Sequence, residues 1–447
     1  MSSSLGRAVP ATRRPCRQRC SATAVVAVTT TSSPHHEATL TRSVATALVE
    51  EQGAALDLAS ECNALQIEEQ DPAPGPSGRV LLEELAALLR DAGMGAPWLD
   101  SWVDAGSLSL VGVRSGEALA EAAVRAAHAC QPRGRDAAVV VVAPHTAAGA
   151  LMLAEAEEDM PVVVRAECFE RGAAAAVKDG LDAADREGRE VGVVLVPNPL
   201  GTGALVPQEE LGEILQCVEQ RCPGAHVVFD ETDGLAVYAE AMAESRGDAM
   251  PWGRAAGFIS ASALLPRGAS TAHVIGSFGV AAGLPPGRAV HFAYSQSGEW
   301  RGRLPPDTFA HAASMALAER GETVRSTFAA NVGFVALRQR LVRDALATLG
   351  VATGTSAGIP VHAGGAGLYA WVDLREYLTE SDDFIAELEL FNDMLYSFGV
   401  MLLPGGTCGA ITPGWFRICV TGSRAELREG VERLELALRT RNPTGGG

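Results

Sequence analysis

Apolar runs alternate with amphipathic or alanine-rich stretches across residues 108–310 of the 447-residue chain. The runs are short and rich in β-branched residues, as buried strands are, and they cover residues 139–142, 162–164, 193–196, 227–229 and 273–275. The stretches that separate several of them have helical periodicity and cover residues 117–129, 172–186 and 208–220. Helices that alternate with continuously apolar strands predict a largely parallel sheet covered on both faces.

Polar residues follow two of these predicted strands. Ligands of an open parallel sheet bind beyond the carboxyl ends of its strands, so these positions are informative. Asn198 lies in the turn of residues 197–202, where its side-chain amide can point sideways. Asp230 ends the next strand, and a carboxylate at a buried strand end is costly unless a cation pairs with it. We therefore expect a binding site at this edge of the sheet.

The last third of the chain has a different pattern. Residues 324–346 predict a long helix, residues 384–395 an amphipathic helix, and residues 404–408 a turn. Residues 414–420 predict a strand that carries one arginine, Arg417. An arginine among apolar strand neighbours is typical of a salt-bridge partner, and a ligand contact is the second interpretation.

The N-terminal segment differs from the rest of the chain. Residues 1–45 contain no acidic side chain before Glu37, and their arginines lie among serine, threonine and alanine. This composition is typical of an organellar transit peptide or of a disordered tail, and both interpretations stay open. We expect a cytoplasmic or organellar protein that is neither secreted nor inserted in a membrane. Residues 71–78 predict a linker and residues 80–91 a helix.

Charge and composition exclude several classes of partner. A formal net charge of −18 argues against nucleic acid and anionic membranes as the main partner. No apolar run reaches the roughly 20 residues of a membrane-spanning helix. The nine cysteines form no CxxC pair, so we expect reduced thiols and neither a metal site nor a disulfide framework. Lys178, the single lysine of the sequence, lies in a predicted helix, where we expect a solvated position.

Residues 273–288 form an apolar strand followed by a glycine- and proline-rich loop that ends at Arg288, a composition that suits an anion. This segment, Asn-Pro-Leu-Gly-Thr at residues 198–202, Asp-Glu at residues 230–231 and the order of motifs over residues 367–420 carry a family resemblance. The chain resembles the class I/II aminotransferases, in particular the 1-aminocyclopropane-1-carboxylate synthases. The resemblance implies fold type I of the pyridoxal-phosphate enzymes: an α/β protein with a mostly parallel central sheet and a small α+β domain from both chain ends.

The resemblance also implies roles for individual residues. Asn198 would hydrogen-bond the ring oxygen of pyridoxal 5′-phosphate, and Asp230 would bind the protonated ring nitrogen. Arg417 would bind the α-carboxylate of an amino-acid substrate through a bidentate contact. Asp233 replaces a family tyrosine that donates to the ring oxygen, and a second carboxylate there would repel that oxygen.

Five further positions belong to the implied cofactor site. Ser115 and Gly116 occupy the place of the phosphate loop at a helix start, where backbone N–H groups attract anions. Ser277 and Arg288 match positions of the cofactor-lysine loop. His145 takes the place of an aromatic residue that stacks on the ring, and a histidine of a surface loop is the second interpretation.

The lysine position of this loop is Val280. The family lysine forms a Schiff base with the cofactor and acts as general base, and valine has no amine for either task. We therefore expect no catalytic residue in the lysine role and a degenerate site that binds the cofactor non-covalently, if at all. A regulatory subunit that pairs with an active paralogue, and an active enzyme with an atypical mechanism, are the alternatives. The expected partners are an amino-acid-like small molecule and a second subunit, identical or paralogous.

Pattern and resemblance together predict five segments. They are residues 1–45 as a disordered or transit-like segment, 46–105 as the N-terminal part of the small domain, 106–320 as the large cofactor domain, 321–440 as the C-terminal small domain, and 441–447 as a tail.

Overall fold

The computed structural model describes the greater part of the chain beyond residue 105. The described residues are 56–57, 106–131, 137–155, 161–169, 171–234, 236–237, 258–265, 268–278, 289–305, 321–352, 361–362, 365–379 and 383–441. The predicted N-terminal segment, the linker at 71–78 and the helix at 80–91 lie outside them. Val280 and Arg288 also lie outside the described residues.

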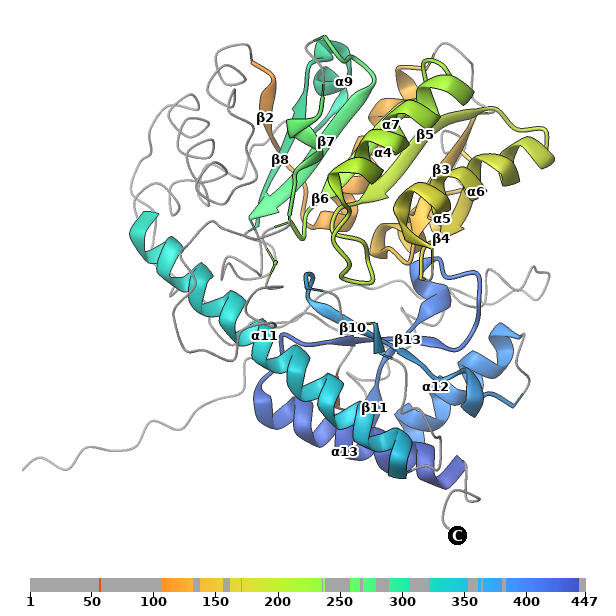
Figure 1. Cartoon of the computed structure of the whole chain (residues 1–447), viewed down its shortest axis with the longest axis vertical. Coiled ribbons are helices and arrows are strands. Elements are labelled where there is room, and N and C mark those ends of the chain that lie inside the picture. Colours follow the sequence, from red (N-terminus) through yellow and green to blue (C-terminus); the bar gives the residue numbers. More distant parts are fainter. Residues whose placement is uncertain are drawn as a thin grey trace, which may run out of the picture. The chain divides into compact units, whose positions relative to one another are not determined.

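A seven-stranded sheet is the centre of the described part of the chain (Figure 1), with the strand order β2-β8-β7-β6-β5-β3-β4. Its strands are β2 (Leu108–Val111), β3 (Ala138–Ala143), β4 (Val163–Glu167), β5 (Val191–Pro197), β6 (His226–Glu231), β7 (Ala272–Phe278) and β8 (Val290–Ser295). Neighbouring strands from β4 to β7 pair in parallel, whereas β8 is antiparallel to both β7 and β2. The predicted largely parallel sheet is confirmed.

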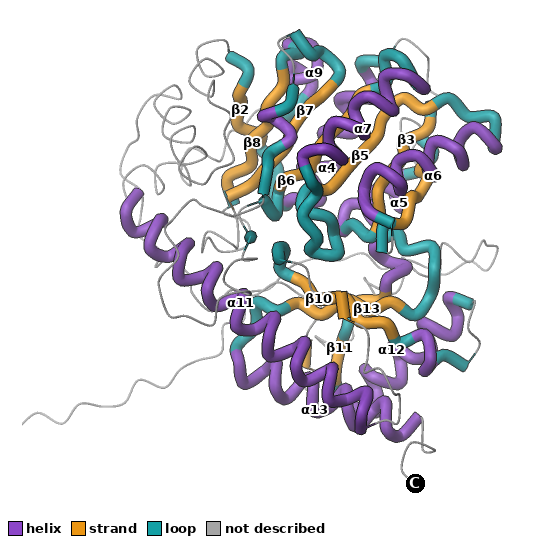
Figure 2. The backbone as a smooth tube through the Cα atoms, in the orientation of Figure 1, coloured by secondary structure: helices purple, strands orange, loops and turns teal. Residues whose placement is uncertain are grey.

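Helices cover both faces of this sheet (Figure 2). Alternate residues of each strand point to opposite faces, so each strand contacts both helix layers. Val139 and Val141 pack in one apolar cluster with residues of α4 (Gly116–Ala129), α5 (Thr146–Ala154) and α9 (Gly298–Arg303). Val140 and Val142 pack in the other with residues of α6 (Gly172–Arg186) and α7 (Gln208–Arg221). The continuous valine run is therefore explained by burial on two sides.

The C-terminal part forms a smaller antiparallel sheet. Its order is β12-β13-β10-β9, with β9 (Val361–His362), β10 (Tyr369–Asp373), β12 (Leu403–Pro404) and β13 (Trp415–Cys419). Its helices are α11 (Gly321–Ala352), α12 (Phe384–Phe398) and α13 (Arg424–Arg441). A parallel pair joins β1 (Leu56–Asp57) to β11 (Val400–Met401), so residues near both ends of the sequence meet here. The domain boundaries stay a prediction.

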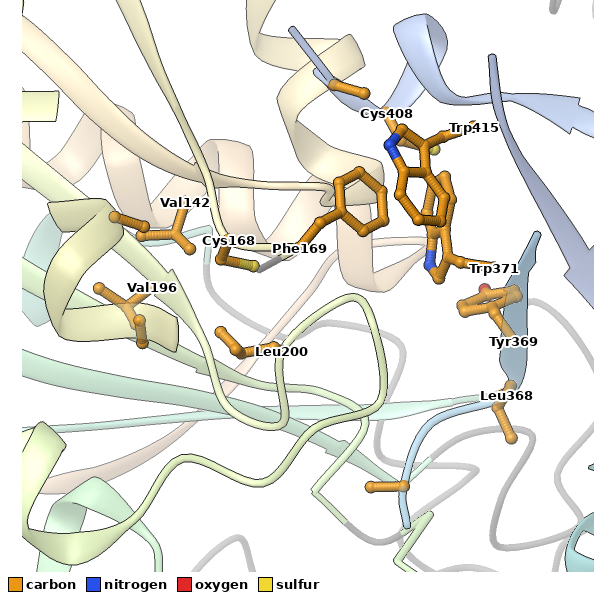
Figure 3. Packing of buried hydrophobic residues seen from close by; sticks show 14 of the residues in the cluster. Val142, Cys168, Phe169, Val196, Leu200, Leu368, Tyr369, Trp371, Cys408 and Trp415 are labelled. Atoms are coloured by element: carbon orange, nitrogen blue, oxygen red, sulfur yellow. The ribbon is translucent and has the colours of Figure 1, made fainter. Parts of the chain in front are cut away.

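The two sheets meet through a small aromatic cluster (Figure 3) and through a close contact at Gly149. The ring of Phe169, which follows β4, stacks on Trp415 at a centroid distance of 4.0 Å and meets Trp371 edge-on at 5.5 Å. The indole N–H of Trp371 donates to the carbonyl of Gly201 at 2.7 Å. A methyl group on Gly149 of α5 would lie 2.1 Å from the carbonyl oxygen of Thr407, in the 3-10 turn η4 (Gly405–Cys408). The close approach of α5 to η4 therefore requires a glycine at this position.

Among the described residues, Lys178 is exposed on α6, as predicted, and all six described cysteines are free thiols. No helix in the described ranges has the length and apolar character needed to cross a membrane.

Replacing Gly149 and Gly212 by alanine tests the packing of α5 against η4. Both glycines lie inside helices, and only Gly149 has an atom where the new methyl group would go. Gly212→Ala should stabilise the protein by about 0.5–1 kcal/mol through helix propensity. Gly149→Ala should destabilise it by roughly 1–3 kcal/mol, because the methyl group collides with a backbone carbonyl. Chemical denaturation measures both, and equal stabilisation by the two variants would contradict the described contact.

Candidate functional site

A pocket lies where the carboxyl ends of β3, β5 and β6 face the smaller sheet. The residues that line it are Pro144, His145, Thr146, Pro197, Pro199, Gly201, Asp230, Thr232, Asp233, Tyr369, Trp371 and Arg417. In the sheet, β3 lies between β4 and β5, so the chain reverses its strand order at this point. Such reversals are where open α/β sheets bind ligands. The structure thus brings together three predicted site residues, His145, Asp230 and Arg417.

Asp230 is held by two donors. Its Oδ1 accepts the backbone N–H of Thr232 at 2.9 Å, and its Oδ2 lies 3.1 Å from Nε2 of His145. The other ring nitrogen of His145, Nδ1, accepts the backbone N–H of Ala147 at 3.2 Å and so caps α5. Because Nδ1 accepts this hydrogen bond, the ring proton lies on Nε2, and the Nε2–H group donates a hydrogen bond to Asp230. Both ring nitrogens are therefore engaged, and the imidazole orients the aspartate.

Glu231, the next residue along β6, belongs to a buried polar network. Its Oε1 accepts from the amide nitrogen of Asn198 at 3.0 Å and from the backbone N–H of Ala261 at 2.7 Å. Its Oε2 accepts from the hydroxyl of Ser260 at 2.6 Å. Burial raises the pKa of the Glu231 carboxyl to about 7, and these hydrogen bonds act in the opposite direction. Residues 258–265, which no sequence motif indicated, thus hold the end of β6.

Asn198 is fully buried in this network. Its second amide hydrogen donates to the carbonyl of Ile259 at 3.0 Å, and its backbone N–H donates to the carbonyl of Asp230 at 2.8 Å. Both amide hydrogens are used inside the protein, and Asn198 does not line the pocket. Its contact with a cofactor ring oxygen stays a prediction, and it would require a rearrangement of these bonds.

Arg417 reaches the pocket from β13 and is 3% exposed. Its guanidinium carbon lies 3.9 Å from the ring centroid of Tyr369, a distance at which a cation is attracted to the ring face. Its backbone pairs with Trp371 of β10 and Leu403 of β12, so Arg417 lies on an inner strand of the smaller sheet. A guanidinium held against an aromatic face in a pocket suits the planar carboxylate of a ligand.

Asp233, which follows β6, lines the same pocket. Burial and then repulsion from Asp230 raise the pKa of its carboxyl to about 6, and the attraction of His145 and of Arg417 acts in the opposite direction. Among the described residues, no group donates a hydrogen bond to this carboxyl. The pocket therefore contains a carboxyl group to which no described residue donates a hydrogen bond.

Ser115 and Gly116 start α4 next to the pocket. The hydroxyl of Ser115 accepts the backbone N–H of Ala118 at 3.2 Å, which makes Ser115 the N-cap. A methyl group on Gly116 would lie 3.4 Å from the side chain of Thr232, one of the pocket residues. Ser277 is buried in the penultimate position of β7. The structure is thus compatible with an anion at the α4 terminus and does not test the predicted roles of these residues.

Sequence reasoning did not assign Tyr369, Trp371, Thr232 or Asp233 as ligand contacts. Tyr369 and Trp371 are alternate residues of one strand, which places them on the same side of it. That spacing was visible in the sequence, but the partner surface was not. The family resemblance places Asp233 near the implied cofactor ring without giving it a ligand contact, and in the structure its carboxyl lines the same pocket as that of Asp230.

Pyridoxal phosphate, the cofactor that the resemblance implies, fits part of this site. Asp230 is a buried carboxyl group that would face a ring nitrogen, and the start of α4 has N–H groups that would face a phosphate. Arg417 is a pocket cation that would face a substrate carboxylate. The described residues leave no amide hydrogen of Asn198 for the ring oxygen.

Comparison with known proteins identifies the class. No protein-family model matches the chain. An aspartate aminotransferase double mutant from Thermus thermophilus superposes with a TM-score of 0.64 and 15% identity, covering 92% of this chain and 100% of that one. An aromatic aminotransferase from Pyrococcus horikoshii gives 0.63 and 17%, covering 89% and 99%. The fold is therefore that of the aminotransferases, fold type I of the pyridoxal-phosphate enzymes.

In sequence, the chain is similar to 1-aminocyclopropane-1-carboxylate synthases. It is 44% identical over 80 residues to the enzyme CMA101 of Cucurbita maxima, over 18% of this chain and 17% of that protein. It is 27% identical over 264 residues to 1-aminocyclopropane-1-carboxylate synthase 1 of Oryza sativa subsp. indica, and the match covers 56% of this chain and 48% of that protein. The chain thus spans less than a fifth of the first relative and about half of the second. The predicted fold and the predicted resemblance are confirmed.

Two buried glutamates provide a matched test of the network around β6. Glu387 of α12 accepts the backbone N–H groups of Gly406 and Gly414, at 3.1 and 2.6 Å, and burial raises the pKa of its carboxyl to about 7 as well. At pH 8, Glu387→Gln should destabilise by roughly 1–3 kcal/mol, because its amide hydrogens face N–H donors. Glu231→Gln should not, because the Ser260 hydroxyl can accept from the new amide and donate to Ser262, 2.6 Å away.

The same Glu231 variant should change the pH dependence of stability. The folded pKa of about 7 lies above the ordinary value of 4.5, so the folded state binds the proton more tightly. This stabilisation is complete below pH 4.5 and is lost as the pH rises to 7, by at most about 3 kcal/mol. Denaturation between pH 4.5 and 8 should show Glu231→Gln gaining stability relative to the wild type. A constant difference would contradict the raised pKa.

Proposed function

We propose that this chain is an aminotransferase-like protein, similar to 1-aminocyclopropane-1-carboxylate synthases, whose site binds pyridoxal phosphate non-covalently together with an amino acid. It does not carry out chemistry that depends on a lysine, because Val280 stands in the Schiff-base position. One observation carries the proposal. Lys178, the single lysine, is exposed on α6 and does not line the pocket.

The chain's own residues have defined tasks in this proposal. Asp230 binds the ring nitrogen, and His145 keeps the aspartate in place through its Nε2 proton. Residues Ser115 and Gly116 hold the phosphate at the start of α4, with Ser277 and Arg288 as further members of the cradle. Arg417 binds the carboxylate of the amino acid. The cofactor supplies an electron sink when it is bound.

Proton transfer at the α-carbon lacks a base among the assigned residues. Valine has no titratable group, and both ring nitrogens of His145 are engaged by Ala147 and Asp230. The site therefore binds and orients a ligand without the group that removes its proton. A sensing or regulatory role, in a homodimer or with a lysine-containing paralogue, fits such a site.

Restoring the lysine tests this function. After incubation with pyridoxal phosphate, the wild-type chain should release the cofactor on dialysis and show no covalent mass increase after borohydride treatment. Val280→Lys should retain a visible-range chromophore and gain the mass of one cofactor, because an amine then lies at the position that the family uses. Absorbance and intact-protein mass spectrometry measure both.

Val280→Leu is the matched control, since it changes the side chain without adding an amine. It should behave as the wild type does. A borohydride-stable adduct on Lys178 of the wild-type chain would contradict the proposal. A chain that binds no cofactor but forms a stable complex with a lysine-containing paralogue would favour the regulatory subunit instead.

A further inference from the structure

Two carboxyl groups line the pocket near the end of β6, and their surroundings differ. Both oxygens of Asp230 have donors, from Thr232 and His145. The carboxyl of Asp233 has no hydrogen bond or ion pair with a described residue. A half-buried carboxylate without a donor is unfavourable unless a ligand supplies one. Asp233 is therefore the carboxyl group of the pocket that a cationic ligand can pair with.

A second charge lies within range. Arg417 lines the same pocket as Asp233, and among the described residues no ion pair joins these two side chains. The pocket therefore presents a carboxylate and a guanidinium that do not neutralise each other by contact. The ammonium and carboxylate groups of an α-amino acid are attached to one carbon atom, so they match such a pair of opposite charges. The rings of Tyr369 and Trp371 complete this part of the pocket.

We propose that Asp233 determines the specificity of this pocket by binding the protonated amine of a free α-amino acid whose carboxylate faces Arg417. This recognition shares the Arg417 contact with the proposed function and needs no cofactor. It predicts that the pocket binds the corresponding 2-oxo acids more weakly. These acids keep the carboxylate and the side chain but have a carbonyl in place of the ammonium. A carbonyl oxygen facing the Asp233 carboxylate meets an acceptor instead of a donor. The pocket therefore selects amino acids over oxo acids, whereas transamination requires a site that accepts both.

Calorimetry of the cofactor-free full-length chain tests this inference with L-leucine and 4-methyl-2-oxopentanoate, which differ only at the amine-bearing carbon. Leucine should bind at least about tenfold more tightly, the minimum expected for a hydrogen bond to a charged group. Asp233→Asn should lower the affinity for leucine by about tenfold and leave that for the oxo acid unchanged or higher. Arg417→Lys should weaken both ligands alike, because the carboxylate is common to them.

Asp344→Asn on α11 is the matched control, because Asp344 is exposed and does not line the pocket. The affinities of this variant for both ligands should equal those of the wild type. The inference is overturned if leucine does not bind, if the oxo acid binds as tightly as leucine, or if Asp233→Asn leaves the preference intact. If Asp233→Asn does not fold, the affinities of the wild-type chain for leucine and 4-methylpentanoate, which lacks the amine, test the inference. 4-Methylpentanoate should then bind at least about tenfold more weakly than leucine, and equal affinities would overturn the inference.

A separate titration with pyridoxal phosphate, followed by absorbance, distinguishes this inference from the proposed function. Cofactor binding without an amino-acid preference overturns the inference alone. An amino-acid preference in a chain that binds no cofactor overturns the proposed function alone.

Discussion

The end of β6 buries two adjacent carboxyl groups, and the rest of the site depends on how each is compensated. Successive residues of a strand point to opposite sides, so Asp230 and Glu231 have different neighbours. Asp230 faces the pocket, where a histidine and a backbone N–H hold it. Glu231 faces away and binds Asn198, Ser260 and the N–H of Ala261. Because buried carboxyl groups are costly without such donors, these contacts hold three loops in register around one strand end.

The second sheet completes the pocket from the other side. Its β10 and β13 supply Tyr369, Trp371 and Arg417, and the indole of Trp371 binds the carbonyl of Gly201 in the loop after β5. The Phe169–Trp415 stack and the contact at Gly149 bring the same two sheets together at neighbouring points. The pocket is therefore an interface within one chain, and its charges come from segments far apart in sequence.

Val280 and the charged groups of the pocket bear on different parts of the proposed function. Valine has no amine for covalent attachment, whereas the buried charges must be compensated by the fold in any case. Asp230 keeps its histidine, and Arg417 keeps its aromatic platform. The proposed recognition of a charged ligand depends on these compensated groups. Asp233 lines the same pocket and is a second acidic group there.

The sequence by itself determined the class of fold, because short valine-rich runs and amphipathic helices can be buried in few other ways than as a doubly covered parallel sheet. It also determined that Val280 has no amine and that Asp230 and Arg417 are candidate contacts. The antiparallel strand β8 and the loop at residues 258–265 had no comparable signal, because their pairing depends on distant partners. Only the tertiary structure decided that Asn198 donates both amide hydrogens to Glu231 and Ile259. It also decided that Asp233 lines the pocket without a hydrogen-bond donor among the described residues. Hydrogen bonds and Coulomb interactions act over a few ångströms, and distances between residues remote in sequence are set only when the chain has folded.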